Sequence, residues 1–279
     1  MHPSDIMNAI IVSIRDGSGM SEFEKVARGV FQVGGSDLSD PSDAAVYVIE
    51  CPAGLVMIDC GAGMAPCTIV ENMQEAGLDP DGLKSLVLTH CHVDHIGSAS
   101  FFRRKYGCEV LAHVLDADAI ETGDSRLTAA AWYGVQLPRT TVDRRLAGDS
   151  EVLDLAGETF AFIHTPGHTP GSIAVCLDRD GERILFGQDI HGPFSREFGS
   201  DIALWRSSME RLLALDADVL CEGHFGVYRP RERVRRYITG YLDRYAGQWP
   251  PRRREGHSRA LSSALIFRTC RFTRCVRHT

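Results

Sequence analysis

Seven residues of the types that bind metal ions fall in four short segments of this 279-residue sequence. The first segment is a His-x-His-x-Asp-His string, and each of three later segments supplies one more histidine or aspartate. Imidazole nitrogens and carboxylate oxygens are usual zinc ligands in catalytic sites, and two ions ~3.5–4 Å apart can share a carboxylate and a bridging hydroxide. The seven candidates are His90, His92, Asp94, His95, His168, Asp189 and His224. This number of ligands predicts a centre for two divalent metal ions.

Each segment follows a short apolar run that predicts a β-strand. These runs span residues 86–88, 159–163, 183–186 and 218–220. Loops at strand ends are where α/β proteins place their ligands, so we expect the four segments to meet at one edge of a sheet. A lone histidine is more often an ordinary hydrogen-bonded residue, and His113, His164 and His257 are interpreted in that way.

The spacing within the string separates its ligands into two pairs. His90 and His92 are two residues apart on an extended loop, so both imidazoles can face one way. Asp94 and His95 begin a predicted helix and can face a neighbouring point. One short loop can therefore supply ligands to two metal ions.

The remaining pattern predicts a mixed α and β domain. Apolar runs separated by a Pro-Ala-Gly turn predict a hairpin over 45–50 and 55–58. Further strands are expected at 109–112 and 172–176, and helices at 68–76, 96–106, 204–215 and 230–245. Residues 116–148 are helical, aromatic and arginine-rich, fit no strand of the sheet, and are assigned to an insertion.

Charge is distributed unevenly along the chain. The net charge is −7, but residues 250–279 contain eight arginines and one acidic residue, so the rest of the chain is strongly acidic. An acidic body argues against binding to a phosphate backbone, because such binding depends on Lys and Arg. We therefore expect an extension at 1–27, a domain at 28–249 and a basic, disordered tail at 250–279, with no nucleic-acid partner.

Cysteine content and hydropathy bear on the compartment. The nine cysteines are odd in number and form no Cys-x-x-Cys pair, which indicates reduced thiols rather than a disulfide framework. No apolar stretch approaches the ~20 residues of a membrane span, and the short apolar run at 6–14 lacks a preceding basic flank. The interpretation is a cytoplasmic protein with no membrane partner.

Five motifs in order give the sequence a resemblance to the metallo-β-lactamase-fold superfamily of hydrolases, in its hydroxyacylglutathione hydrolase and lactonase-like branch. The motifs are DCGAG at 59–63, THCHVDHIG at 89–97, TPGHTPGS at 165–172, FGQD at 186–189 and EGH at 222–224. The resemblance covers about 28–228. It implies an α+β fold, a four-layer αββα sandwich, with the metal centre at one edge and the helical insertion added to it.

The resemblance also implies a role for each ligand. One ion would be held by His90, His92 and His168, and the other by Asp94, His95 and His224. Asp189 would bridge the two ions, and Asp59 would orient a ligand or its loop from behind. Two zinc ions are expected, with manganese or iron as alternatives.

The sequence departs from the residue patterns of several branches of the superfamily, which narrows the range of expected activities. True β-lactamases of similar pattern carry Cys or no ligand where this chain has Asp189, which disfavours lactam cleavage. Flavodiiron proteins replace the second histidine by Glu, whereas His92 is present here. Ribonuclease Z is disfavoured by the acidic body, and the Tyr that assists acyl-homoserine lactonases is missing from 190–194.

The function that follows is hydrolysis of an ester, thioester or lactone, in which a metal-bridging hydroxide attacks the carbonyl carbon of a small-molecule substrate. Asp94 would orient the nucleophile, and His191 or Tyr133 would donate a proton or polarise the carbonyl. Trp132, Tyr133 and Leu137 of the insertion would line an apolar pocket. A homodimer is compatible with this interpretation.

Two other functions stay open at this point. The same string occurs in persulfide dioxygenases, which resemble this sequence and hold a single iron, so a redox enzyme is one alternative. A binding protein that uses the arginine-rich tail is the other. Metal identity with oxygen uptake tests the first alternative, and removal of the tail tests the second.

Overall fold

The computed structural model describes residues 23–248 and contains two β-sheets that pack face to face. The first sheet contains, in spatial order, β1 (Glu24–Ala27), β2 (Val30–Gly34), β3 (Val46–Cys51), β4 (Gly54–Ile58), β5 (Leu83–Val87), β6 (Glu109–His113) and β7 (Arg144–Leu146). The second contains β13 (Val227–Tyr228), β12 (Val219–Glu222), β11 (Glu182–Gln188), β10 (Ile173–Arg179), β9 (Glu158–His164) and β8 (Ser150–Leu155).

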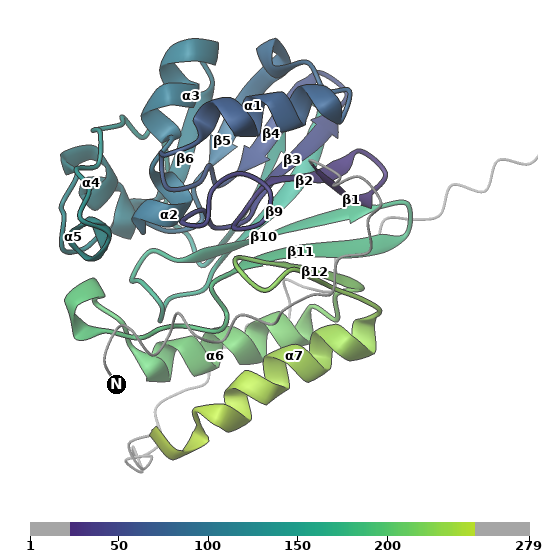
Figure 1. Cartoon of the computed structure of the whole chain (residues 1–279). Coiled ribbons are helices and arrows are strands. Elements are labelled where there is room, and N and C mark those ends of the chain that lie inside the picture. The colour runs from purple at the N-terminus through teal and green to yellow at the C-terminus, as the bar shows by residue number, and fades with distance from the viewer. Residues whose placement is uncertain (1–22, 249–279) are drawn as a thin grey trace, which may run out of the picture.

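Helices cover the outer faces of both sheets (Figure 1). The α-helices are α1 (Pro66–Glu75), α2 (Val93–Ile96), α3 (Ala99–Tyr106), α4 (Val114–Thr122), α5 (Ala130–Tyr133), α6 (Ile202–Ala214) and α7 (Arg231–Arg244). Within residues 23–248, short 3-10 helices span Pro80–Gly82, Arg196–Phe198 and Ala246–Gln248. Helices α1 and α3 lie on the first sheet, and α6 and α7 lie on the second (Figure 1). The expected four-layer αββα sandwich is confirmed.

Side-chain alternation along the strands builds the layers. In β4, Leu55 and Met57 belong to the cluster beneath α1 and α3, whereas Val56 and Ile58 belong to the cluster between the two sheets. Successive strand residues point to opposite faces, so a strand buried on both faces is apolar throughout. This is why the LVMI run carried no alternating pattern in the sequence.

The strand directions bring the four predicted segments to one edge. β4, β5 and β6 are parallel to one another, and β11 is parallel to β12. β9 and β11 both run antiparallel to β10, so they share a direction. The loops after β5, β9, β11 and β12 therefore leave at the same end of the sandwich, where α2 lies (Figure 1).

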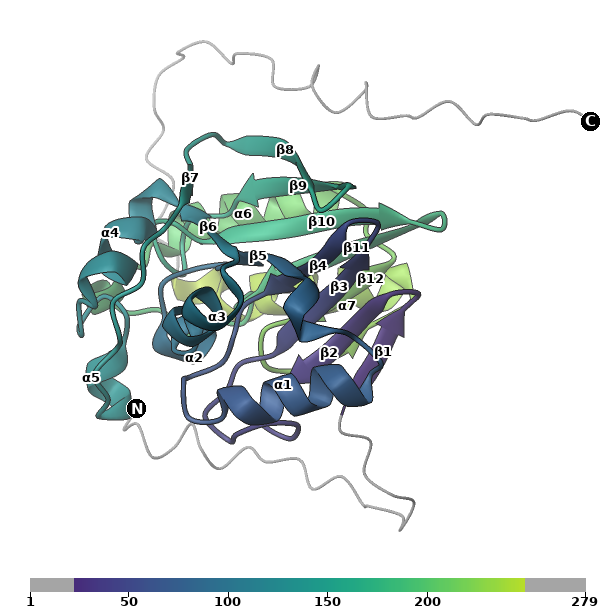
Figure 2. The ribbon, with the colours of Figure 1, turned by 90° about the horizontal axis from the view of Figure 1, so that it is seen from above.

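The segment 116–148 differs from the expected insertion in one respect. It contributes most of α4 and all of α5, which lie together at one end of the sandwich (Figure 2). It also contributes β7, which pairs in parallel with β6 and completes the first sheet. The expectation that this segment contains no strand was wrong, because β7 is a three-residue edge strand of sequence RRL without an apolar run.

The expected domain boundaries can be compared with the two ends of the described region. β1 pairs with β2, so the expected boundary at residue 28 falls inside a hairpin of the first sheet. Residues 1–22 and the tail at 250–279 lie outside the described residues, as does position 249. Within 23–248, none of the helices is long and apolar enough to cross a lipid bilayer. The seven cysteines in this range all carry free thiols.

Candidate metal centre

The seven predicted ligands come together at the edge of the sandwich. Four overlapping groups of side chains each bring one potential ligand atom per residue within 4.8 Å of the others. These groups are His90, His92 and His168; His90, His95 and Asp189; Asp94, His95 and His224; and Asp189, His191 and His224. Every predicted ligand occurs in at least one group, and the first and third groups are the two triads expected from the sequence.

The first triad is a compact set of buried imidazoles. His168 Nε2 lies 2.9 Å from His92 Nδ1, and the ring of His90 lies 4.7 Å from that of His92 and 4.8 Å from that of His168. Burial lowers the pKa of His92 to about 3 and that of His168 to about 4. These imidazoles are therefore neutral at physiological pH and keep the lone pairs that a metal ion needs.

The second triad is joined to the first through Asp189. His224 Nε2 lies 3.3 Å from Asp94 Oδ2 and 3.4 Å from Asp189 Oδ2. The same Asp189 oxygen lies 3.4 Å from His168 Nε2, and Asp189 Oδ1 lies 3.1 Å from His95 Nε2. One carboxylate thus reaches histidines of both triads, which is the position expected of a bridging ligand.

The two carboxylates control the proton affinity of this half of the site. Burial alone would lower the pKa of His224, but Asp189 and Asp94 outweigh it and raise that pKa to about 10. Burial opposes ionisation of Asp189, yet His224 and His95 hold its pKa well below the usual range. A divalent cation would take the place of the proton that these groups attract.

Unbonded polar atoms show that the residues fit a divalent metal ion. His90 Nε2, His95 Nε2 and Asp189 Oδ1 are buried and make no hydrogen bond. A buried polar atom without a hydrogen-bond partner lowers the stability of the folded state by ~1–3 kcal/mol. Without a metal ion, the protein would carry several such atoms in this one cluster. Metal binding in this cluster would satisfy all three atoms, so this cluster is a divalent metal site built from His and Asp ligands.

Asp59 occupies the position behind the ligands that the sequence predicted for it. Its Oδ2 accepts a hydrogen bond from His95 Nδ1 at 2.7 Å and another from Thr89 Oγ1 at 2.7 Å. Its Oδ1 accepts the backbone N–H of Thr89 at 2.8 Å. Because Nδ1 of His95 is held by this carboxylate, Nε2 is left free for a metal ion and lies 3.1 Å from Asp189 Oδ1.

A glycine allows the bridging carboxylate to lie where it does. A Cβ atom on Gly223 would stand 2.3 Å from Asp189 Oδ1. No side chain fits in that space, so the glycine of the EGH motif is required by the close approach of β11 and β12 at their ends. The motif joins this glycine directly to a ligand, His224.

Two buried carboxylates that support the site were not predicted. Asp116 accepts hydrogen bonds from Cys91 N at 2.9 Å and Gly171 N at 2.7 Å, which ties the His-x-His-x-Asp-His loop to the loop of His168. Glu222 accepts the backbone N–H of His224 at 2.7 Å. Glu222 could have been found from its place in the EGH motif, whereas nothing in the sequence distinguishes Asp116.

The two predicted proton donors both lie next to residues of the second triad. Tyr133 is 42% exposed, and burial of its hydroxyl together with the charge and hydrogen bonding of Asp94 raises its pKa. His191 lies beside His224, with ring centroids 5.2 Å apart, and its Nδ1 is 2.8 Å from Glu222 Oε1. Both residues border the metal site, and their role as proton donors stays a prediction.

Aromatic side chains form a wall next to the first triad, in which Trp132 is exposed and Phe198 is buried. The ring of Phe198 lies 4.6 Å from that of His92, and the ring of Trp132 lies 4.6 Å from that of Phe198. Trp132 is 56% exposed. On the other side, the ring of Phe225 lies 4.7 Å from that of His191. Apolar surface therefore flanks the polar centre on both sides; Phe198 and Phe225 were not predicted.

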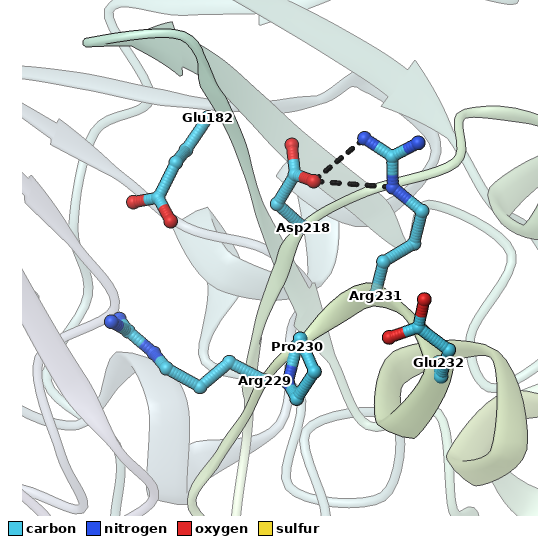
Figure 3. Close-up of a pocket in the computed structure, with 6 residues that line it drawn as sticks. All are labelled: Glu182, Asp218, Arg229, Pro230, Arg231 and Glu232. Atoms are coloured by element: carbon cyan, nitrogen blue, oxygen red, sulfur yellow. Dashed lines mark hydrogen bonds and ion pairs between the residues drawn. The ribbon is translucent and has the colours of Figure 1, made fainter.

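A surface pocket of about 430 Å³ lies elsewhere (Figure 3). Its lining residues are Glu182, Asp218, Arg229, Pro230, Arg231 and Glu232. Glu182 begins β11 and Asp218 precedes β12, so the pocket lies at the opposite end of these strands from Asp189 and His224. Arg231 Nη2 pairs with Asp218 Oδ1 at 2.6 Å, and the pocket contains none of the candidate ligands.

The sequence and the fold both match known proteins. The model of the Metallo-beta-lactamase superfamily matches residues 39–224. The "Probable metallo-hydrolase YflN" of Bacillus subtilis is 26% identical over 269 residues, which cover 84% of this chain and 96% of that protein. A solved metallo-β-lactamase of Cronobacter sakazakii superposes with a TM-score of 0.70 at 21% identity, covering 81% of this chain and 93% of that one. At this identity the superposition shows the fold alone.

Two further relatives are enzymes with named substrates. An acyl-coenzyme A thioesterase of Bos taurus is 27% identical over 251 residues, which cover 77% of this chain and 85% of that protein. A hydroxyacylglutathione hydrolase of Haemophilus influenzae is 29% identical over 167 residues, which cover 57% of this chain and 75% of that protein. The family match spans the loops that bear all seven candidate ligands, and the chain therefore belongs to the metallo-β-lactamase superfamily and is a metal-dependent hydrolase.

Proposed function

We propose that this protein is a dinuclear metal hydrolase that cleaves acyl esters, with thioesters as the first substrates to test and lactones as the next. The position of Asp189 carries the proposal, because its two oxygens lie 3.1 Å from His95 Nε2 and 3.4 Å from His168 Nε2. A carboxylate between two triads is suited to bridge two ions. The thioesterase and glutathione thioester hydrolase among the relatives support the choice of thioesters.

The ligand assignment follows the two triads. His90, His92 and His168 would hold one ion, the second triad would hold the other, and Asp189 would bridge them. Asp94, His95 and His224 make up that second triad. When bound, two zinc ions, or manganese or iron in their place, would lower the pKa of water toward ~7 and polarise the substrate carbonyl.

The residues around the centre would orient the reactants. Asp94 would accept a hydrogen bond from the attacking water and hold it in line, because its carboxylate lies within reach of both His224 and Tyr133. Tyr133 is suited to donate a hydrogen bond to the carbonyl or leaving-group oxygen, since its raised pKa keeps the phenol protonated at neutral pH.

The apolar wall would select the acyl group. The exposed Trp132 packs on the buried Phe198, which contacts His92, so an acyl chain lying against Trp132 would bring its carbonyl carbon toward the centre. Burial of apolar surface contributes about 25 cal/mol per Å². A small-molecule substrate with an apolar acyl part is therefore expected. Cytoplasmic location and homodimer formation stay predictions.

The first experiment is metal analysis of the purified full chain, coupled to a screen of thioesters, aryl esters and lactones with oxygen uptake followed in parallel. About two zinc or manganese ions per chain with hydrolysis independent of oxygen would support the proposal. About one iron with oxygen uptake on a persulfide would replace it with a dioxygenase. Removing residues 250–279 should leave turnover unchanged, whereas a binding protein that uses the tail would lose its partner.

A pair of histidine variants sharpens the test. His168→Ala removes a ligand and should lower both metal content and hydrolysis. His164→Gln is the matched control, because the His164 side chain contacts the Pro170 carbonyl through Nε2 and the ring of His113, and belongs to neither triad. Full metal content and activity in His168→Ala would contradict the assignment.

A further inference from the structure

Two histidine–carboxylate pairs of the same construction face the bridging carboxylate. In the first, Asp59 Oδ2 lies 2.7 Å from His95 Nδ1. In the second, Glu222 Oε1 lies 2.8 Å from His191 Nδ1. Histidines that bind metal ions almost always donate their other ring N–H to a carboxylate, carbonyl or water, which fixes the tautomer. His191 thus has the environment of a metal ligand, although no triad expected from the sequence includes it.

We propose that His191 is an additional metal ligand, which binds a divalent cation through Nε2 together with Asp189 and His224. The proposal rests on the dinuclear centre proposed above. The potential ligand atoms of these three residues lie within 4.8 Å of one another. Because Nδ1 donates its proton to Glu222, the lone pair of the neutral imidazole is on Nε2.

The backbone around His191 is fixed on several sides. Tyr245 Oη donates a hydrogen bond to the His191 carbonyl at 2.9 Å, and Trp205 Nε1 donates to the Ile190 carbonyl at 3.0 Å. The ring of Phe225 packs on the ring of His191 at 4.7 Å. Only 14% of the His191 side chain is exposed. A ligand held in this way loses little freedom when it binds an ion.

Glu222 acts as the positioning residue for this side of the centre. It is fully buried, and while Oε1 holds His191, Oε2 accepts the backbone N–H groups of His224 at 2.7 Å and Phe225 at 2.8 Å. The same carboxylate therefore sets the orientation of His191 and the path of the loop that carries His224. Both ligands depend on one side chain that touches no ion itself.

An additional ligand predicts unequal affinities for the two ions. The ion near His224 would have one more protein ligand than the triad provides, whereas the ion near His168 would keep its three histidines and the shared carboxylate. Tighter binding on the His224 side follows, so the first metal equivalent should occupy that side.

The test uses metal-free full-length protein titrated with Co²⁺, whose visible absorption reports coordination, and with Zn²⁺ in competition with a chelator. His191→Ala should weaken the tighter site at least tenfold and change the Co²⁺ spectrum of the first equivalent. Glu222→Gln should weaken the same site by about 10–100-fold, the usual cost of losing an outer partner of a ligand. His164→Gln is the control and should leave both affinities and spectra unchanged, because His164 belongs to none of the ligand groups.

The outcomes separate this inference from the proposed function. If His191→Ala keeps the wild-type affinities and Co²⁺ spectrum while kcat falls, His191 acts on the substrate and is not a ligand. If the wild-type protein itself binds fewer than two ions, the dinuclear function fails first. Co²⁺ binding in His191→Ala also reports on folding, because an unfolded variant would lose both sites rather than one.

Discussion

Thr169 Oγ1 donates a hydrogen bond to Asp116 Oδ2 at 2.7 Å, although the two residues are 53 positions apart in the chain. The same carboxylate accepts the backbone N–H groups of Cys91 and Gly171. Asp116 is buried and has no cationic partner among these contacts. Its three donors come from the two loops that flank the first triad, so α4 links those loops without contacting an ion.

Asp116→Ala should therefore destabilise the protein and loosen the first triad together. Three buried donors would lose their acceptor at about 1–3 kcal/mol each, and we expect a loss of at least ~3 kcal/mol in the free energy of unfolding by urea. Asp118→Asn in the same helix is the control. Its ion pair with Arg145 is exposed, so a loss of only ~0–1 kcal/mol is expected. Equal losses in both variants would contradict the linking role.

Gly223→Ala should remove metal binding while the fold persists. The new methyl group would stand 2.3 Å from Asp189 Oδ1, so the bridging carboxylate must move. Metal content should fall below two ions per chain, measured by elemental analysis. Gly240→Ala provides the comparison, because nothing lies within 4 Å of its added Cβ in α7. That variant should keep both ions and gain about 0.5–1 kcal/mol of stability.

Trp132→Ala should affect apolar substrates selectively. We expect KM for a long-chain acyl thioester to rise about tenfold, equivalent to ~1.4 kcal/mol, with little change for an acetyl thioester. Val152→Ala serves as control, since Val152 is 60% exposed on β8, outside the residues that contact the centre. An equal rise in KM for both chain lengths would argue against an acyl-binding wall.

His113 should make folding stability depend on pH. Burial and the nearby His164 lower its folded pKa to about 4, whereas an unfolded histidine titrates near ~6.5. Between these values the unfolded chain binds a proton that the folded chain does not, so stability falls as pH falls from about 6.5 to about 4. The loss attributable to His113 should be on the order of 2 kcal/mol.

His113→Asn isolates this contribution. Nδ1 of His113 accepts the Leu115 N–H at the start of α4, and Asn can accept the same bond without titrating. The difference in unfolding free energy between the wild type and the variant, measured in urea from pH 7 to 4.5, should shrink as pH falls. A constant difference would show that His113 binds its proton equally well in the folded and unfolded chains, which contradicts a lowered folded pKa.

The edge that carries the ligands was predictable because each ligand lies close in sequence to the strand that positions it. Asp189 follows β11 directly, and His224 follows β12 after one glycine. Parallel strands end at the same edge, so position along the chain implied position in space. The role of Asp59, by contrast, came from the resemblance to the superfamily and its DCGAG motif. The hairpin of β3 and β4 was also correct, because its turn residues and apolar runs are adjacent in sequence.

The supporting residues depend on contacts between distant segments. Asp116 meets Thr169 and Gly171 only after both sheets have formed, and its sequence neighbours give no sign of this. Phe198 reaches His92 from a 3-10 helix that lacks an apolar period. Strand β7 was missed because Arg144 forms an edge ion pair with Glu109 instead of a buried contact.

The division of ligands between the two sheets has a consequence for assembly. The loop after β5 of the first sheet carries His90, His92, Asp94 and His95. The loops after strands of the second sheet carry His168, Asp189 and His224. Each triad draws from both, so neither half of the sandwich holds a complete triad by itself. Bound ions would therefore cross-link the two sheets at this end of the sandwich. Metal binding would then indicate that the two sheets have packed together. Removal of the metal by a chelator would let them separate first at that end.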